Sequence, residues 1–222
     1  MELGDIYRGT RARIFDLVGE LSEEEATAIA PGAPKWSVHD IVAHLTGLTA
    51  DVLSGNIEGA ATDPWTAKQV EARKHRSMAE LLAEWDANAE QFEPLVDAVP
   101  QMARTAMDIL VHEHDIRGAL QLAGPSDPEM VDFVLQRSVA FFGERIPAAI
   151  RIQAGTSEWL VGPGEPAASV TTNEFELFRA FFGRRSVGQV SSWDWDGDPK
   201  PYLDAINVFG PLPEEDVHEP TG

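Results

Sequence analysis

The helical spacing of apolar residues over residues 1–146 is the feature that most limits how this chain can fold. Apolar side chains recur there every three or four positions, and serine, proline or glycine marks the ends of the segments. The pattern predicts helices over residues 4–21, 38–52, 78–98, 100–124 and 128–143, with a loop over 56–67. Because such helices bury their apolar faces against each other, the economical fold is a four-helix bundle with an extra helix.

A second pattern begins near Pro147. Apolar segments separated by glycine and proline predict three short strands, at residues 149–153, 158–161 and 168–172. Helices are predicted over 174–182 and near 199–208. We therefore predict a helical domain over residues 1–146, a small α+β domain over 147–210, and an acidic, disordered tail over 211–222.

The charge of the chain limits its partners. There are 17 Lys and Arg residues against 37 Asp and Glu residues, which gives a formal charge of −20 at pH 7. Such a field repels phosphate backbones and anionic lipid surfaces. We expect no nucleic-acid or membrane partner, and a small molecule as the ligand.

Cysteine is absent from the sequence. A disulfide framework and a four-cysteine zinc site are therefore excluded, and thiol chemistry would need a thiol from a cofactor or substrate. The N-terminus carries no apolar signal core, and no run approaches 18 apolar residues. We expect a soluble, cytoplasmic protein that is a monomer or a homodimer.

The segment from residue 105 to residue 120 carries the most specific chemistry. Asp108 and His112 lie four residues apart, so a helix directs the carboxylate and the imidazole to the same face. Asp115 follows along that face, whereas two residues of helix rotate His114 away by roughly 200°. A carboxylate and an imidazole on one face can hold two corners of a divalent-metal site if another helix brings a third ligand.

His44 is the candidate for that third ligand. It lies at the edge of the apolar stripe of the predicted helix 38–52, whereas His39 points toward solvent. A histidine beside an apolar stripe is more often a hydrogen-bonded core residue, and an Asp-x₃-His pair alone is more often a surface pair. Together with Asp108 and His112, however, His44 would leave open positions on a metal, as in a catalytic zinc site.

Two further features have both a functional and a structural interpretation. Arg184 and Arg185 follow a helix that ends at Gly183, so they either form an anion clamp or neutralise part of an acidic surface. Asp115 either orients a metal-bound histidine from behind or is an ordinary solvated helix residue, which is the commoner case.

Several of these motifs occur in a fixed order along the chain. They are WSVHDIVAH at residues 36–44, Asp108-x₃-His112-x₂-Asp115, GRRS at residues 183–186, and Trp195-x-Gly-Asp198. In this order and spacing they resemble the mycothiol-dependent maleylpyruvate isomerase family. The resemblance covers residues 5 to about 210, and the motifs are specific through their order rather than individually.

The resemblance implies a DinB-like four-helix bundle followed by an α+β domain similar to sterol-carrier folds. It implies a divalent metal, usually zinc, on His44, Asp108 and His112. The middle ligand of the family is commonly Glu, so Asp108, one methylene shorter, implies either a closer helix or a lower affinity. A family arginine maps onto Arg184, with Arg185 as the rival.

The resemblance also implies mycothiol as the thiol cofactor. A zinc ion with an open position would bind the thiol and lower its pKa. The thiolate would add to an activated double bond and allow cis–trans isomerisation, or displace a leaving group as a transferase, while Arg184 holds a carboxylate. Two alternatives stay open: a hydrolase that uses metal-activated water, and a non-catalytic small-molecule-binding protein with a vestigial metal site.

Overall fold

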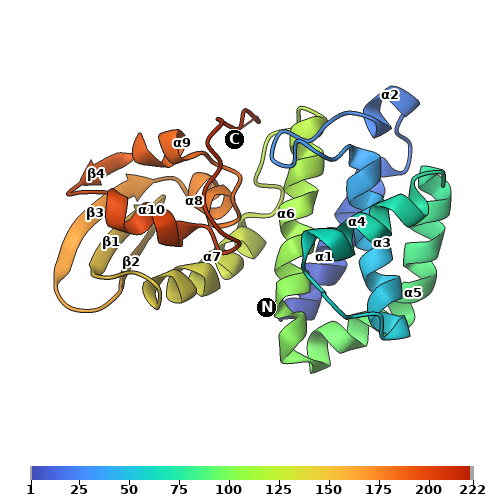
Figure 1. The fold of residues 1–222 in the computed structure, drawn as a ribbon, viewed down its shortest axis with the longest axis horizontal. Coiled ribbons are helices and arrows are strands. Elements are labelled where there is room, and N and C mark those ends of the chain that lie inside the picture. The colour runs from blue at the N-terminus through green and yellow to red at the C-terminus, as the bar shows by residue number, and fades with distance from the viewer. Residues whose placement is uncertain (1, 221–222) are drawn as a thin grey trace. The chain divides into compact units, whose positions relative to one another are not determined.

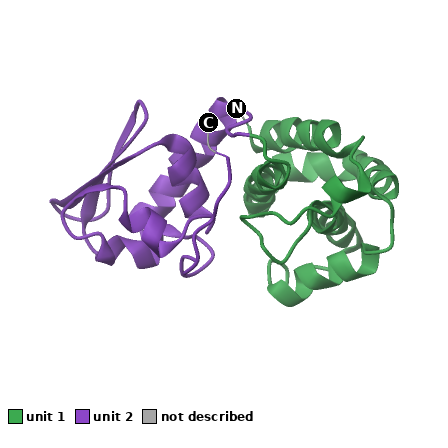
Figure 2. Cartoon of the chain, turned by 90° about the horizontal axis from the view of Figure 1, so that it is seen from above, with its two compact units in different colours: residues 1–122 green, residues 123–222 purple. Residues whose placement is uncertain are grey.

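The computed structural model describes residues 2–220 and divides the chain into two compact units, unit 1 up to Leu122 and unit 2 from Ala123 (Figure 2). Residue 1 of the predicted helical domain and residues 221–222 of the predicted tail lie outside the described residues.

Unit 1 is a helical bundle (Figure 1). Its four long helices pack against one another: α1 (Leu3–Val18), α3 (Val38–Ser54), α5 (Met78–Ala98) and α6 (Ala103–Ala119). The shorter elements are α2 (Glu23–Ala26), α4 (Asp63–Arg73) and the 3₁₀ turn η1 (Pro100–Met102), and α4 lies along α3. The predicted four-helix bundle is confirmed.

Local sequence explains where two of the long helices begin. Ser37 and Ser77 each accept a hydrogen bond from the backbone N–H three residues later, and an acidic side chain there bonds back to the serine N–H. Such a cap stabilises a helix by about 1 kcal/mol. The helices then bury a continuous core that includes Ile41, Trp85 and Ile109.

Helix α4 corrects the prediction of a loop over residues 56–67. Its first turn contains Pro64, which suits a helix start because its missing N–H would have no intrahelical partner. The helix buries Trp65 and Gln69, and one of these is polar. With so little apolar periodicity, the segment does not show a helical pattern in the sequence.

Unit 2 combines a four-stranded sheet with helices. Its elements are α7 (Pro128–Gly143), β1 (Ala149–Ala154), β2 (Ser157–Val161), β3 (Pro166–Thr172), α8 (Glu174–Phe181), α9 (Val187–Ser191), β4 (Asp194–Asp196) and α10 (Lys200–Ile206). The strand order is β2-β1-β3-β4, with β1 antiparallel to β2 and parallel to β3, and β3 antiparallel to β4. The predicted α+β character is confirmed.

The boundary of the compact units lies earlier in the chain than the predicted domain boundary at residues 146/147. Helix α7 packs against α8 and β2, so it belongs to unit 2. The change of pattern at Pro147 marks the start of the sheet, and the units separate before α7.

The predicted disordered tail is ordered over its described residues. Leu212 is buried, the Val187 N–H donates to the Pro213 carbonyl at 3.0 Å, and the Glu219 side chain is in an ion cluster. The prediction of disorder rested on the acidity of the tail alone. In the structure, buried arginines of unit 2 supply the opposite charge that holds Glu219.

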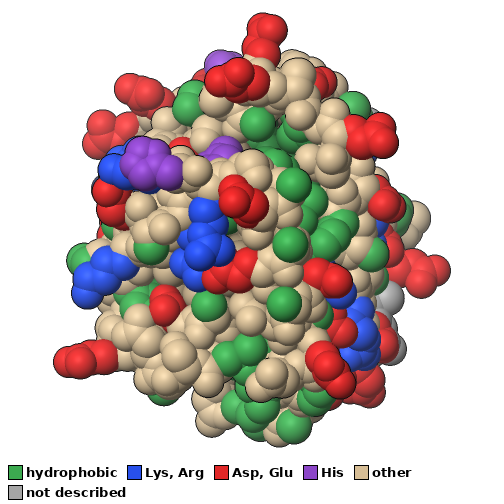
Figure 3. Space-filling model, turned by 90° about the vertical axis from the view of Figure 1, so that its right-hand side faces the viewer, with side chains coloured by type: hydrophobic (Ala, Val, Ile, Leu, Met, Phe, Trp, Pro, Cys, Tyr) green, Lys and Arg blue, Asp and Glu red, His purple; other side chains and the backbone are tan. Residues whose placement is uncertain are grey.

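The surface agrees with the acidic composition. Figure 3 shows one face on which acidic side chains are spread widely, with Lys and Arg side chains between them. Among the described residues, no helix combines the length and the apolar character needed to cross a bilayer.

Candidate metal centre

The three predicted ligands converge inside unit 1. His44 on α3 and Asp108 and His112 on α6 each present one ligand atom, and these atoms all lie within 4.8 Å of one another. Both histidines are buried, and the Asp108 side chain keeps 27% exposure. These distances confirm the predicted convergence. It arises because α3 packs directly against α6.

His44 is held in a defined tautomer by a chain of hydrogen bonds. The Asp51 carboxylate can only accept, so the Gln69 Nε2 donates to it at 2.7 Å. This turns the Gln69 Oε1 toward the His44 Nδ1, at 2.7 Å, so that the Nδ1 carries the proton. In the neutral ring this leaves the lone pair on the His44 Nε2, which lies 3.4 Å from Asp108 Oδ2.

Asp115 fixes His112 in the same tautomer. Its Oδ2 accepts from the His112 Nδ1 at 3.0 Å, and the carboxylate is fully buried. The His112 Nε2 lies 3.6 Å from Asp108 Oδ1. Asp115 therefore orients the histidine, and the commoner alternative of a solvated helix residue is wrong here.

This donor set suits a small divalent cation. Two imidazole lone pairs and a carboxylate are all acceptors, and acceptors that face one point favour a positive ion between them. A tetrahedral zinc ion with bonds of about 2.0–2.1 Å separates its ligand atoms by roughly 3.3–3.4 Å. The 3.4 Å from His44 Nε2 to Asp108 Oδ2 is close to that value, while His112 Nε2 lies 3.6 Å from the other oxygen, Oδ1, and one ligand atom from each residue lies within 4.8 Å of the others.

Trp36 forms an aromatic wall beside the two histidines. Its ring centroid lies 5.1 Å from that of His44 and 5.6 Å from that of His112, with the second pair stacked at 28°. The indole therefore limits the rotation of both imidazoles and makes that side of the centre apolar.

Gln69 was missed in the sequence because the helix that carries it was not predicted: residues 56–67 were predicted as a loop, and residues 68–77 were assigned to no element. The replacement Gln69→Met keeps a similar volume but removes the acceptor for the His44 Nδ1. We expect Co²⁺ or Zn²⁺ affinity to fall about 10- to 100-fold, the range for loss of an outer partner of a ligating histidine. Chelator competition would measure it, with the exposed Lys68→Met on the same helix as the control. Equal affinities in the two variants would contradict this role.

His114 is separate from the three converging side chains, as predicted, but it does not face solvent. It is buried, and its Nδ1 bonds to the Leu110 carbonyl at 2.8 Å. The neighbouring Glu113 side chain is also buried and accepts three hydrogen bonds from the Arg13 guanidinium, at 2.8–3.1 Å. Helix α6 thus carries a structural polar face beside its candidate ligands.

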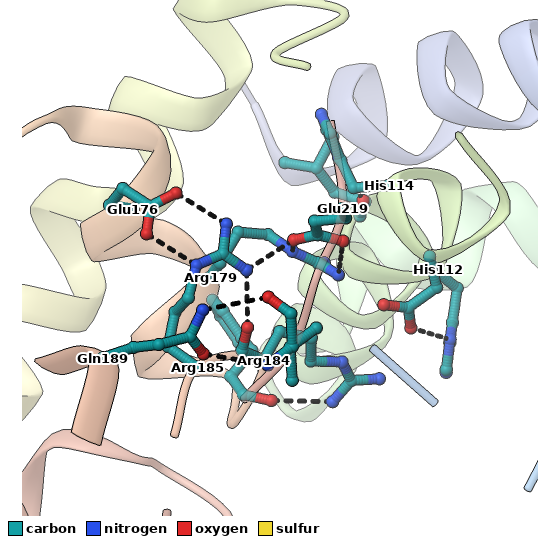
Figure 4. Close-up of polar contacts among 12 residues, drawn as sticks. His112, His114, Glu176, Arg179, Arg184, Arg185, Gln189 and Glu219 are labelled. Atoms are coloured by element: carbon teal, nitrogen blue, oxygen red, sulfur yellow. Dashed lines mark hydrogen bonds and ion pairs between the residues drawn. The ribbon is translucent and has the colours of Figure 1, made fainter. Parts of the chain in front are cut away.

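The two arginines after α8 have different surroundings (Figure 4). The half-buried Arg184 donates from Nη1 to the Phe182 carbonyl at 2.7 Å. Arg185 is buried and forms ion pairs with Glu176 and Glu219, each at 2.6 Å. Burial lowers the pKa of Arg185, but these two carboxylates outweigh burial and leave that pKa raised. Arg185 therefore already binds two carboxylates of the chain itself, and Arg184 is the stronger candidate for the predicted anion clamp.

Comparisons with known proteins agree on one family. The family model described as the mycothiol maleylpyruvate isomerase N-terminal domain matches residues 7–117, half of the chain. Two solved structures, described as the mycothiol-dependent maleylpyruvate isomerase and a histidine-to-alanine mutant of it, resemble this chain with a TM-score of 0.55 and 8% sequence identity. Each match covers 99% of this chain and 95% of the other.

At that identity the likeness of the solved structures concerns the fold alone, and a comparison with curated proteins finds no match. The family is shown by the sequence of unit 1, because the matched residues include most of α1, all of α3 and α5, and nearly all of α6. The bundle, its converging side chains and the matched domain together show that this chain belongs to the mycothiol maleylpyruvate isomerase family.

Proposed function

We propose that this chain is a metal-dependent enzyme that uses a low-molecular-weight thiol, mycothiol, to isomerise a small electrophilic substrate. The observation that carries the proposal is the convergence of two oriented imidazole nitrogens and one carboxylate within 4.8 Å. The family and the names of the similar structures support the thiol and the reaction type. S-transfer by the same thiol is the second outcome that this site supports.

The residues of the chain would hold the metal and keep its ligands aligned. His44, Asp108 and His112 would bind it, with Gln69 and Asp115 fixing the two imidazoles. When bound there, a divalent cation with open positions would supply a Lewis acid that lowers the pKa of a thiol. Because the chain has no cysteine, that thiol must come from outside the protein.

The experiment that tests the proposal combines metal analysis with thiol dependence. The purified protein should contain close to one zinc or a similar divalent metal ion per chain. It should turn over an electrophilic cis-olefin, with maleylpyruvate as the first choice, only when mycothiol is added. Equal turnover without a thiol would favour the hydrolase, and a metal-free protein that binds ligand would favour a binding protein.

Arg184 is proposed to hold a carboxylate of the substrate or of the thiol cofactor. Removing a charged hydrogen bond of about 1.5–3 kcal/mol should lower kcat/KM about 10- to 100-fold in Arg184→Ala. The metal content should stay unchanged, because the candidate ligands all lie in unit 1. The matched control is Arg151→Ala, an exposed arginine of β1 paired with Glu158. An unchanged kcat/KM in Arg184→Ala would show that Arg184 holds no carboxylate of the substrate or of the cofactor.

A further inference from the structure

The last described residues of unit 2 end in a buried ion cluster (Figure 4). We call residues 211–220 the C-terminal strap. The Glu219 carboxylate accepts from Arg179 Nε at 2.7 Å and Nη2 at 2.9 Å, and from Arg185 Nη1 at 2.6 Å. The Arg179 side chain is fully buried and that of Glu219 is 2% exposed. One carboxylate thus lies in a site formed by two buried guanidinium groups.

The two arginines are positioned by elements other than the strap. Arg179 lies on α8, the helix that Asn173 caps. Glu176, on the same helix, accepts from Arg185 Nε and Nη2, both at 2.6 Å, and the Arg184 carbonyl accepts from Arg185 Nη1 at 2.5 Å. Helix α8 and the loop after it therefore form the site, and the strap contributes the anion.

The strap is held mainly by polar contacts. The Gln189 Oε1 accepts from the Val217 N–H at 3.0 Å, the Gln189 Nε2 donates to the Val217 carbonyl at 2.9 Å, and Asp216 accepts from the Ser186 hydroxyl. Among the described residues of the strap, Leu212 is the large apolar side chain that is buried. Because the strap buries so little apolar surface, the ion cluster is its main anchor, and Glu219 leaves the two arginines at a small cost only where another anion takes its place.

We propose that Arg179 and Arg185 form a carboxylate-binding site of unit 2 that is closed by the chain's own Glu219, and that a small molecule bearing a carboxylate displaces the strap. Arginine forks match the planar shape of a carboxylate, and Arg179 already engages both oxygens of Glu219. Because Glu219 is tethered, it competes at an effective concentration on the order of millimolar or more. A free carboxylate therefore binds weakly until the strap is weakened.

This site is separate from the proposed metal chemistry. Its residues all belong to unit 2, and the tests below measure neither metal content nor turnover. A negative result would therefore leave the proposed function unaffected.

The first test compares Glu219→Gln with the matched control Glu215→Gln, an exposed carboxylate of the same strap. The amide of Glu219→Gln keeps the size of the side chain and removes its charge. Thermal midpoints are recorded with sodium acetate and with sodium chloride at equal ionic strength. We expect Glu219→Gln to have a lowered midpoint in chloride and to regain most of it in acetate, at a roughly ten-fold lower acetate concentration than affects the natural chain.

The control variant should respond to acetate as the natural chain does. An identical response of Glu219→Gln to acetate and chloride would overturn the proposal, since the cluster would then be structural only. If sodium sulfate restored the thermal midpoint of Glu219→Gln, relative to the natural chain, as well as sodium acetate does, the assignment to carboxylates would be overturned.

The second test needs no change to the cluster, so it decides the question even if Glu219→Gln fails to fold. Because the chain has no cysteine, Glu215→Cys provides a unique position for a spin label on the strap. The label should become more mobile as acetate is added to the protein, and remain unchanged in chloride. Equal mobility in the two salts would show that no carboxylate displaces the strap.

Discussion

The variant His112→Ala is expected to lose stoichiometric metal binding. The substitution removes one of the three candidate ligands and leaves His44 and Asp108. It also removes the imidazole that Asp115 orients. The loss should exceed the roughly 100-fold effect of removing an outer partner, so dialysed protein should contain almost no metal. Elemental analysis and the visible spectrum of the Co²⁺ form would measure this.

The matched control is His75→Ala, an exposed histidine of unit 1 that lies outside the three converging side chains. It should keep the metal content and the Co²⁺ spectrum of the natural chain. The natural protein should also gain thermal stability when the metal is added, because a ligand that binds only the folded state stabilises it, and His112→Ala should not. A His112→Ala protein that retains one metal ion per chain would show that the ion binds elsewhere.

Much of the helical unit could be predicted because its signals are local. The serine caps at residues 37 and 77 and the apolar stripes identify α3 and α5, and the four-residue spacing of Asp108 and His112 identifies one face of α6. His44 could be proposed because it borders an apolar stripe. Its position opposite Asp108 depends on how the helices pack, which no local pattern shows. The order of the motifs, through its resemblance to a family, was what connected His44 with Asp108 and His112.

The features that could not be predicted depend on partners far apart in the chain. Gln69 bonds to His44 across 25 residues, from a helix with too few apolar residues to be recognised. Glu219 reaches Arg179 across 40 residues, so the acidity of the tail suggested disorder when its partners were unknown. Asp115 was the exception, because its three-residue spacing from His112 already placed it within reach.

The ion pair between Arg13 and Glu113 leads to the second large effect. Arg13 on α1 makes three hydrogen bonds to Glu113 on α6, and the Glu113 side chain has no solvent exposure. Because Arg13→Met removes the cation and leaves the carboxylate buried, it should lower the free energy of unfolding much more than the loss of a surface pair does. Helices α1 and α6 pack against each other in the bundle, and α6 also carries Asp108 and His112.

We expect Arg13→Met to lower the free energy of unfolding of unit 1 by about 3 kcal/mol, near the lower end for a broken buried pair, because Arg13 itself keeps 24% exposure. Urea denaturation followed by helical circular dichroism would measure it. The matched control is Arg8→Met, on the same helix, whose pairs with Asp5 and Asp97 are exposed and should contribute less than about 1 kcal/mol. The double variant Arg13→Met with Glu113→Gln should be more stable than Arg13→Met alone, because it also removes the buried charge. If the two single arginine variants lost the same stability, Glu113 would not be a buried charge that needs Arg13.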